Sequence, residues 1–244
     1  MRRGPFEHER CELSIVRKLK LKIRQLFHNA FFDRYVRNIG SAGPIGDVED
    51  IYRYATRANM SVLYCIQSKE ELLPVLRKIK AQSPKVVLEI GTAGGATLFM
   101  LTRVADPTAT VISLDLPDGP FGGGYSEQRV PLYQAFAQPE QTMHLMREDS
   151  HQPATLDKLK DLLQGRQIDF ALIDGDHTYE GVKQDYEMYA DLVRPGGLIA
   201  FHDIVYAEGV ARFWDEIKQA DPTAEEFIAT QGSVFGLGVI TKAS

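Results

Sequence analysis

The chain has 244 residues, of which 44% are hydrophobic and 25% are charged, a composition typical of a globular protein with a sizeable core. Its apolar runs are shorter than the roughly 18 residues that a membrane span needs, and its first residues lack the apolar segment of a signal peptide. Two cysteines form neither a disulfide framework nor a zinc pattern. We therefore expect a cytoplasmic protein.

The formal net charge of -5 is unevenly distributed along the chain. Residues 1–37 hold ten basic and four acidic residues, whereas the remainder carries a net charge of -11. An acidic body argues against nucleic acid as the main partner. It suits a cationic ligand.

Residues 13–37 have the pattern of a basic amphipathic helix, with Ile15, Leu19, Ile23 and Leu26 at helical spacing between lysines and arginines. We expect this helix to pack on its own domain or to form a homo-oligomer contact. Peripheral attachment to an anionic membrane surface is the alternative. The turn-rich stretch GSAGPIG at 40–46 predicts a boundary between an arm, 1–46, and a body, 47–244.

From residue 48 onward, helical and strand patterns alternate. We expect, in chain order, helices at 48–60 and 68–82, a strand at 86–90, a helix at 94–105, a strand at 110–115, a helix at 127–137, a strand at 143–147, a helix at 154–164, a strand at 168–173, a helix at 179–193, a strand at 197–201, a helix at 208–219 and a strand at 234–240. This alternation predicts an α/β fold with a parallel sheet covered on both faces.

Ionisable side chains follow several of these strands. In open α/β sheets, ligands bind beyond the carboxyl ends of the strands. The residues at those ends are Glu89, Asp115, Asp149 with Ser150, Asp174 with Asp176 and His177, and His202 with Asp203. Each one alone could be a helix cap or a solvated loop charge, but their clustering indicates a functional edge.

The first of these strands runs into a glycine turn, Gly91-Thr92-Ala93-Gly94-Gly95, where glycine lets the backbone approach a ligand. Asp115 lies 24 residues after Gly91, at a spacing where an acid binds ribose hydroxyls. The second glycine of the dinucleotide fingerprint is missing, and Glu89 would repel a pyrophosphate. A cationic nucleoside such as S-adenosyl-L-methionine, facing Glu89, Asp115 and Asp149, fits better.

On these residues the sequence resembles the class I S-adenosylmethionine-dependent methyltransferases. The turn Glu89–Gly95 and Asp115 match their first two motifs, and Phe235–Ile240 looks like their antiparallel last strand. The stretches 122–126, 149–151, 173–182, 202–204 and 209–214 are similar to a narrower branch, which holds cephalosporin-hydroxylase-like proteins and metal-dependent macrolide-sugar O-methyltransferases. The resemblance covers about residues 62–240. It implies a Rossmann-like, seven-stranded, mostly parallel sheet with helices on both faces and an antiparallel last strand.

The same resemblance implies roles for individual residues. In the sugar methyltransferases, the spacing Asp174-x-x-His177 places a metal ligand and the general base, so we expect His177 and Asp174 to be catalytic. We expect a divalent metal, Mg²⁺, on Asp174, His202 and Asp203. Because Mg²⁺ prefers oxygen ligands, the imidazole of His202 leaves the identity and the presence of the metal undecided. The alternative role of His202 is to hydrogen-bond a ligand or the cofactor. The expected cofactor contacts are Glu89, Gly91, Thr92, Ala93, Gly95, Asp115, Asp149, Ser150 and Asp174.

The function implied is metal-assisted O-methylation of a small-molecule acceptor, a sugar or natural-product hydroxyl. Two alternatives remain: a non-haem-iron oxygenase, because aspartates and histidines can also hold iron, and a non-catalytic protein that keeps the cofactor pocket. An NAD-dependent dehydrogenase is disfavoured. Tyr179 and Lys183 have the spacing of its catalytic pair, but the glycine turn lies far into the chain and lacks the fingerprint.

Overall fold

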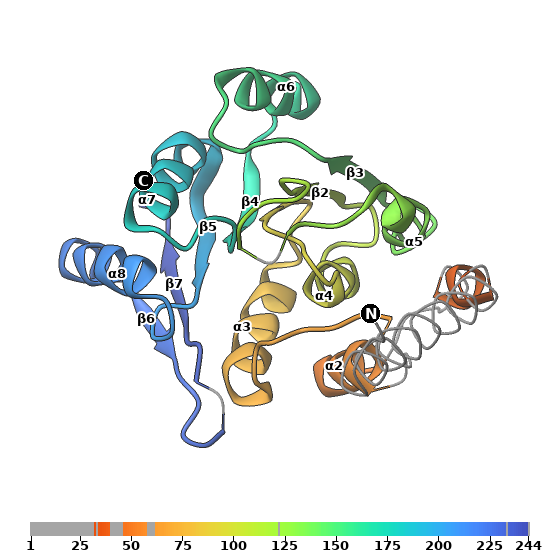
Figure 1. Cartoon of the computed structure of the whole chain (residues 1–244), viewed down its shortest axis with the longest axis horizontal. Coiled ribbons are helices and arrows are strands. Elements are labelled where there is room, and N and C mark those ends of the chain that lie inside the picture. The colour runs from red at the N-terminus through yellow and green to blue at the C-terminus, as the bar shows by residue number, and fades with distance from the viewer. Residues whose placement is uncertain are drawn as a thin grey trace, which may run out of the picture. The chain divides into compact units, whose positions relative to one another are not determined.

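The computed structural model describes residues 32, 34–39, 46–57, 62–121, 123–232 and 234–243 (Figure 1). The chain divides into two compact units, Met1–Ala42 and Gly43–Ser244. In the first unit, residues 34–39 are helical, and most of the predicted helix at 13–37 lies outside the described residues. Among the described residues, no helix is long and apolar enough to cross a membrane.

The second unit is built on a sheet of seven strands in the order β3-β2-β1-β4-β5-β7-β6. Strands β1 to β5 run parallel, and β7 is antiparallel to β5 and to β6. The strands are β1 Val86–Ile90, β2 Thr110–Leu114, β3 Thr142–Met146, β4 Ile168–Ile173, β5 Val193–His202, β6 Glu225–Phe227 and β7 Leu237–Thr241. The predicted Rossmann-like sheet with an antiparallel last strand is confirmed.

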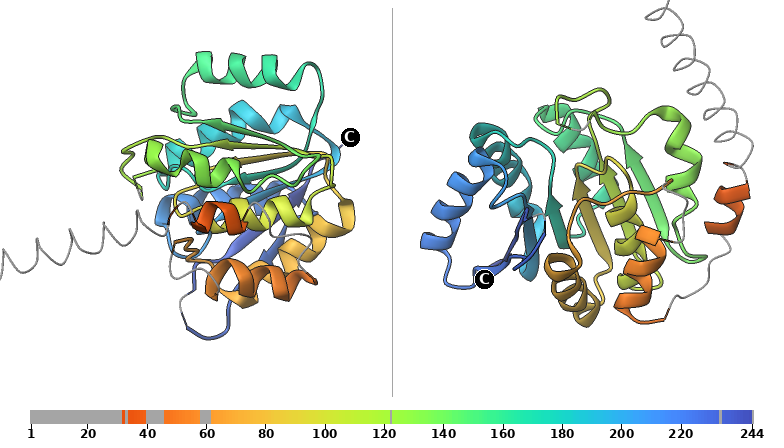
Figure 2. Two further views of the ribbon diagram at one scale, coloured as in Figure 1. Left: turned by 90° about the vertical axis from the view of Figure 1, so that its right-hand side faces the viewer. Right: turned by 60° about the horizontal axis from the view of Figure 1, so that its bottom comes forward.

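Helices cover both faces of this sheet (Figure 2). Apolar residues of α6, α7 and α8 join one core with alternate residues of the strands, and α2 to α5 lie on the opposite face. The helices are α2 Val48–Arg57, α3 Lys69–Gln82, α4 Ala96–Val104, α5 Val130–Gln134, α6 Pro153–Leu163, α7 Tyr179–Tyr189 and α8 Glu208–Ala220. Because both faces are covered, β1 and β2 are buried at every position, as their continuous apolar runs predict.

Some element boundaries differ from the prediction. The helix expected at 127–137 is a 3₁₀ turn, Glu127–Arg129, followed by the five-residue α5. Strand β6 was not predicted, because Glu225 and Glu226 give it no apolar alternation, and it forms only by pairing with β7. Such a short, charged strand at a sheet edge has no local signal of its own.

Candidate functional site

The topology brings the ends of β4 and β5 together. These strands are parallel neighbours, with Ile173 opposite Phe201. Asp174 follows the first strand directly, and the second strand ends in His202, followed by Asp203. The ionisable residues that lie 28 positions apart in the sequence, Asp174 and His202, therefore meet at the carboxyl edge of the sheet.

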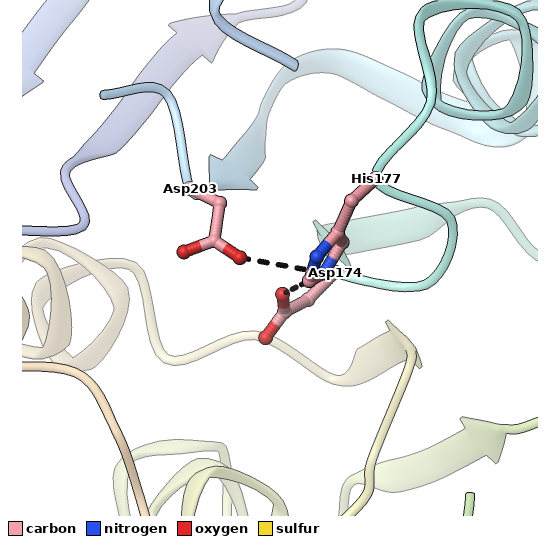
Figure 3. A group of neighbouring side chains, drawn as sticks. All are labelled: Asp174, His177 and Asp203. Carbon is pink, nitrogen blue, oxygen red and sulfur yellow. Dashed lines mark ion pairs between the residues drawn. The ribbon is translucent and has the colours of Figure 1, made fainter. Parts of the chain in front are cut away.

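Asp174, His177 and Asp203 form a compact group, which we call the Asp–His–Asp cluster. Nε2 of His177 lies 3.6 Å from Oδ1 of Asp174 and 3.4 Å from Oδ2 of Asp203 (Figure 3). One ligand atom from each residue lies within 4.8 Å of the others. Asp203 is buried, and its backbone has a φ of +62°, a left-handed conformation that costs energy and is found at functional sites.

His202 lies behind this cluster. Its Nδ1 is 2.9 Å from Oδ1 of Asp174 and 3.2 Å from Oδ1 of Asp203, and the imidazole is buried. Burial alone would lower the pKa of His202, but the two carboxylates outweigh it and raise the pKa to about 10. In this arrangement His202 is a cation between two carboxylates, and His177 takes the place in the converging group that was expected for His202. The metal-ligand role of His202 stays a prediction.

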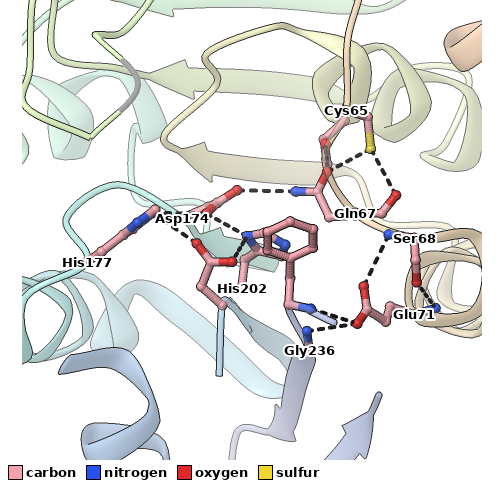
Figure 4. Close-up of polar contacts among 11 residues, drawn as sticks. Cys65, Gln67, Ser68, Glu71, Asp174, His177, His202 and Gly236 are labelled. Atoms are coloured by element: carbon pink, nitrogen blue, oxygen red, sulfur yellow. Dashed lines mark hydrogen bonds and ion pairs between the residues drawn. The ribbon is translucent and has the colours of Figure 1, made fainter. Parts of the chain in front are cut away.

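A residue that the sequence analysis did not identify holds the other oxygen of Asp174. Nε2 of the buried Gln67 lies 3.3 Å from Oδ2 of Asp174, while its Oε1 accepts a hydrogen bond from the Cys65 thiol at 2.7 Å (Figure 4). Gln67 lies in the irregular segment before α3, which has no hydrophobic period. The one local signal nearby is the capping box formed by Ser68 and Glu71.

The glycine turn after β1 packs against the end of β4. Gly91 has a φ of +87°, and a Cβ atom there would lie 2.0 Å from the carbonyl oxygen of Asp174. Only glycine fits this position without a shift of the backbone. Beyond it, the backbone N–H of Ala93 donates to Oδ2 of Asp115 at 3.0 Å, so that the turn is fastened to the end of β2.

Glu89 lies beneath this turn rather than at its surface. It is 1% exposed and accepts a hydrogen bond from Oγ1 of Thr92 at 2.7 Å. Burial raises the pKa of Glu89 well above its ordinary value of 4.5. Burial therefore disfavours the charged form of Glu89, whose carboxyl lies beneath the turn.

A pocket opens beside the Asp–His–Asp cluster, with about 490 Å³ of empty space that is partly open to solvent. Its lining includes four of the predicted cofactor residues, Gly91, Asp115, Asp149 and Ser150. Burial raises the pKa of Asp115 to about 6, against hydrogen bonds that lower it. Oδ1 of Asp149 accepts a hydrogen bond from the backbone N–H of His151, which also lines the pocket. Predicted residues at the ends of β1, β2 and β3 thus share one edge.

Comparison with known proteins supports the predicted fold. Residues 88–204 match a family described as a methyltransferase domain. This match agrees with the resemblance to class I S-adenosylmethionine-dependent methyltransferases that the sequence motifs indicate. The matched region runs from β1 to the residue after Asp203, so it includes the glycine turn, the pocket and the Asp–His–Asp cluster.

Solved structures share the fold of this chain. An O-methyltransferase from Bacillus cereus in complex with SAH (S-adenosylhomocysteine) is 20% identical, with a TM-score of 0.51 over 86% of this chain and 97% of the other. TomG, an O-methyltransferase from Streptomyces achromogenes in complex with SAM, is 16% identical, with a TM-score of 0.52 over 81% and 89%. MycE, a methyltransferase of mycinamycin biosynthesis in complex with Mg and SAH, is 17% identical, with a TM-score of 0.52 over 81% and 55%.

One curated relative, the uncharacterized protein y4gI of Sinorhizobium fredii, is 23% identical over 151 residues. The match covers 59% of this chain but only 16% of the relative. This chain thus spans a small part of that protein's length.

Proposed function

We propose that this methyltransferase transfers the methyl group of S-adenosyl-L-methionine to a hydroxyl oxygen of a small-molecule acceptor, a sugar or another natural product. The observation that carries the proposal is the Asp–His–Asp cluster, which lies at the ends of β4 and β5, next to the pocket at the glycine turn. A proton acceptor beside the cofactor pocket is what methylation of a neutral hydroxyl needs. The solved relatives with bound SAM or SAH include O-methyltransferases.

In this proposal the pocket holds the cofactor through residues on four strand ends. Gly91 and the following turn, Thr92, Ala93 and Gly95, let the cofactor approach the backbone, and Glu89 supports the turn from below through Thr92. Asp115 faces the ribose hydroxyls. Asp149 and Ser150 face the adenine, and Asp174 lies nearest the reacting methyl group.

His177 is the proposed general base. The pKa of His177 is raised above 6.5, mainly by its contact with the Asp174 carboxylate. The negative charge of Asp203 raises it further. The carboxylates thus favour proton uptake at Nε2. As the acceptor oxygen attacks the methyl carbon, the carbon–sulfur bond breaks, its electron pair stays on sulfur, and Nε2 of His177 takes the hydroxyl proton. The products are the methyl ether and S-adenosylhomocysteine.

The same residues suit a divalent cation. Two carboxylates and an imidazole converge within 4.8 Å. Asp174 and Asp203 would hold Mg²⁺ with water, and the His177 imidazole would also suit Mn²⁺ or Fe²⁺. Bound there, the cation would lower the pKa of the acceptor hydroxyl. Non-haem-iron oxygenases use two histidines and one carboxylate, the reverse of this cluster, so methyl transfer is the better supported function.

The test is labelled methyl transfer from S-adenosyl-L-methionine to a panel of hydroxylated acceptors, before and after chelation and with Mg²⁺ or Mn²⁺ restored. We expect His177→Ala to lower kcat by about 10²- to 10⁴-fold, with the Kd for S-adenosylhomocysteine unchanged by calorimetry. His144→Ala, which removes an imidazole from β3, is the control. Full activity of His177→Ala would exclude His177 as the general base. Retained metal binding in that variant would show that His177 is not a metal ligand.

A further inference from the structure

Large apolar side chains are exposed at the same edge as the Asp–His–Asp cluster. Ile66 is 51%, Phe121 38%, Val205 46% and Tyr206 69% exposed. They come from three separate segments: the one before α3, the one after β2 and the one after β5. Soluble proteins seldom gather exposed apolar residues from distant segments unless the patch binds something.

Two aromatic rings stack on the two histidines of the site. The ring of Phe121 stacks on His177, with centroids 5.1 Å apart and an interplanar angle of 28°. The ring of Phe235 stacks on His202 at 5.9 Å, also at 28°. Because both histidines contact both Asp174 and Asp203, the two phenylalanines bracket the carboxylates that the proposed chemistry uses.

The wall on the His202 side is held in place by the backbone. The N–H groups of Val205 and Tyr206 donate to the carbonyl oxygen of Phe235 at 2.9 and 3.3 Å, and the Phe235 N–H donates to Oε1 of Glu71 at 3.0 Å. The Tyr206 ring packs against Phe235 with centroids 5.1 Å apart. An aromatic pair fixed in this way loses little freedom when it binds a ligand, which favours affinity.

From this arrangement we infer that the acceptor carries its hydroxyl on, or next to, a neutral apolar ring system. That ring system packs between Phe121 on one side and the Tyr206–Phe235 pair on the other. The inference rests on the proposed function, since it names the class of molecule that the site methylates. It excludes a free sugar, which has no ring system large and apolar enough to fill the space between these rings, and a sugar nucleotide, whose anionic diphosphate would face the carboxylates of Asp174 and Asp203. Aromatic side chains also bind ring systems by stacking, beyond the burial of area.

The test measures binding to the full chain saturated with S-adenosylhomocysteine, by saturation-transfer NMR and calorimetry. The probes are 2-naphthyl β-D-glucopyranoside, methyl β-D-glucopyranoside and uridine diphosphate glucose. We expect the naphthyl glycoside to bind at least about tenfold more tightly than the other two. Equal affinities, tighter binding of the sugar nucleotide, or no binding of the naphthyl glycoside would each overturn the inference.

Three variants test where the naphthyl glycoside binds. Phe121→Ala and Tyr206→Ala are each expected to lower the affinity for this probe by about three- to tenfold, while Leu162→Ala on α6 leaves the affinity unchanged. Tyr206 is 69% exposed, so its truncation does not open the core. Unchanged affinity in both Phe121→Ala and Tyr206→Ala would refute the inference that these aromatic rings bind the acceptor. Ring-dependent binding with no methyl transfer to any hydroxyl would instead refute the proposed function and leave the apolar site standing.

Discussion

At the scale of single residues, a buried aspartate controls a histidine that lines the cofactor pocket. Asp185 of α7 is fully buried, and neither of its carboxylate oxygens has a hydrogen-bond partner among the described residues. Nε2 of His151 lies 3.3 Å from Oδ1 of Asp185 and 3.2 Å from the Gly181 carbonyl oxygen. This contact is the largest cause that raises the pKa of His151 above 6.5, and the field of Asp149 and Asp176 adds to it.

We predict that Asp185→Asn lowers the pKa of His151 toward its ordinary value of 6.5, because the amide removes the negative charge. The measurement is an NMR titration of the His151 ring protons. In the wild type, the pair stabilises the fold below pH 6.5, and this stabilisation is lost as pH rises through the raised pKa. The difference in unfolding free energy between wild type and variant should therefore shrink at alkaline pH.

The control for that titration is Asp191→Asn, since the Asp191 side chain is 91% exposed and pairs with Lys242. It should leave the His151 titration as it is in the wild type. An unchanged His151 pKa in Asp185→Asn would show that the Asp185 carboxylate is not what raises it.

At the scale of elements, the N-terminus of α3 holds the segment that precedes β7. Oε2 of Glu71 accepts from the Ser68 N–H at 3.1 Å, and its Oε1 accepts from the N–H groups of Ala229, Phe235 and Gly236 at 3.3, 3.0 and 2.9 Å (Figure 4). One carboxylate thus completes a capping box and fixes the segment that carries Phe235. Burial would raise the pKa of Glu71, but these hydrogen bonds outweigh it and lower the pKa below 4.5.

We predict that Glu71→Gln lowers the free energy of unfolding by about 1–3 kcal/mol near neutral pH, since several backbone donors lose a charged acceptor. Because the pKa of Glu71 is lowered on folding, its contribution is present above pH 4.5 and is lost as pH falls through the folded value. Urea unfolding near pH 7 and near pH 3 checks this.

Glu187→Gln is the matched control on α7, since the Glu187 side chain is 63% exposed. We expect it to change stability little at either pH. A loss in Glu71→Gln that is equally large in acid would show that the carboxylate charge is not what holds the segment.

At the scale of the whole molecule, the chain divides into two compact units, Met1–Ala42 and Gly43–Ser244. Helix α2 belongs to the body. Ile51 and Ala55 of this helix are buried, and the Tyr54 ring stacks on Phe99 of α4 with centroids 5.3 Å apart. The proposed boundary after residue 46 leaves this packing intact.

We predict that the chain without residues 1–46 unfolds cooperatively and binds S-adenosylhomocysteine as the full chain does. Removal of residues 1–57 also deletes α2 and should lower the melting temperature by several degrees, because it exposes Phe99 and its neighbours. Thermal unfolding and calorimetry compare the two truncated chains.

If the arm, residues 1–46, mediates assembly, as predicted from the sequence, sedimentation should show a smaller particle for the chain that lacks residues 1–46. Unchanged assembly, membrane binding and activity would refute a role for the arm.

Much of this molecule follows from its sequence. Continuous apolar runs predicted β1, β2 and β4, and the alternation with helices predicted the parallel sheet, because periodicity and turn residues act locally. Strand ends also predicted the place of Asp174, His177 and Asp203, since the carboxyl ends of parallel strands meet at one edge.

Only the tertiary structure decided how these residues pair. It placed His202 behind the cluster, between two carboxylates that raise its pKa, and Glu89 beneath the turn, where burial raises its pKa. It brought Gln67 to the site from a segment without a hydrophobic period, and it placed Phe235, from the start of the predicted last strand, on the His202 ring. Charge state and side-chain contacts depend on burial and on partners far away in the sequence, and no local pattern encodes those distances.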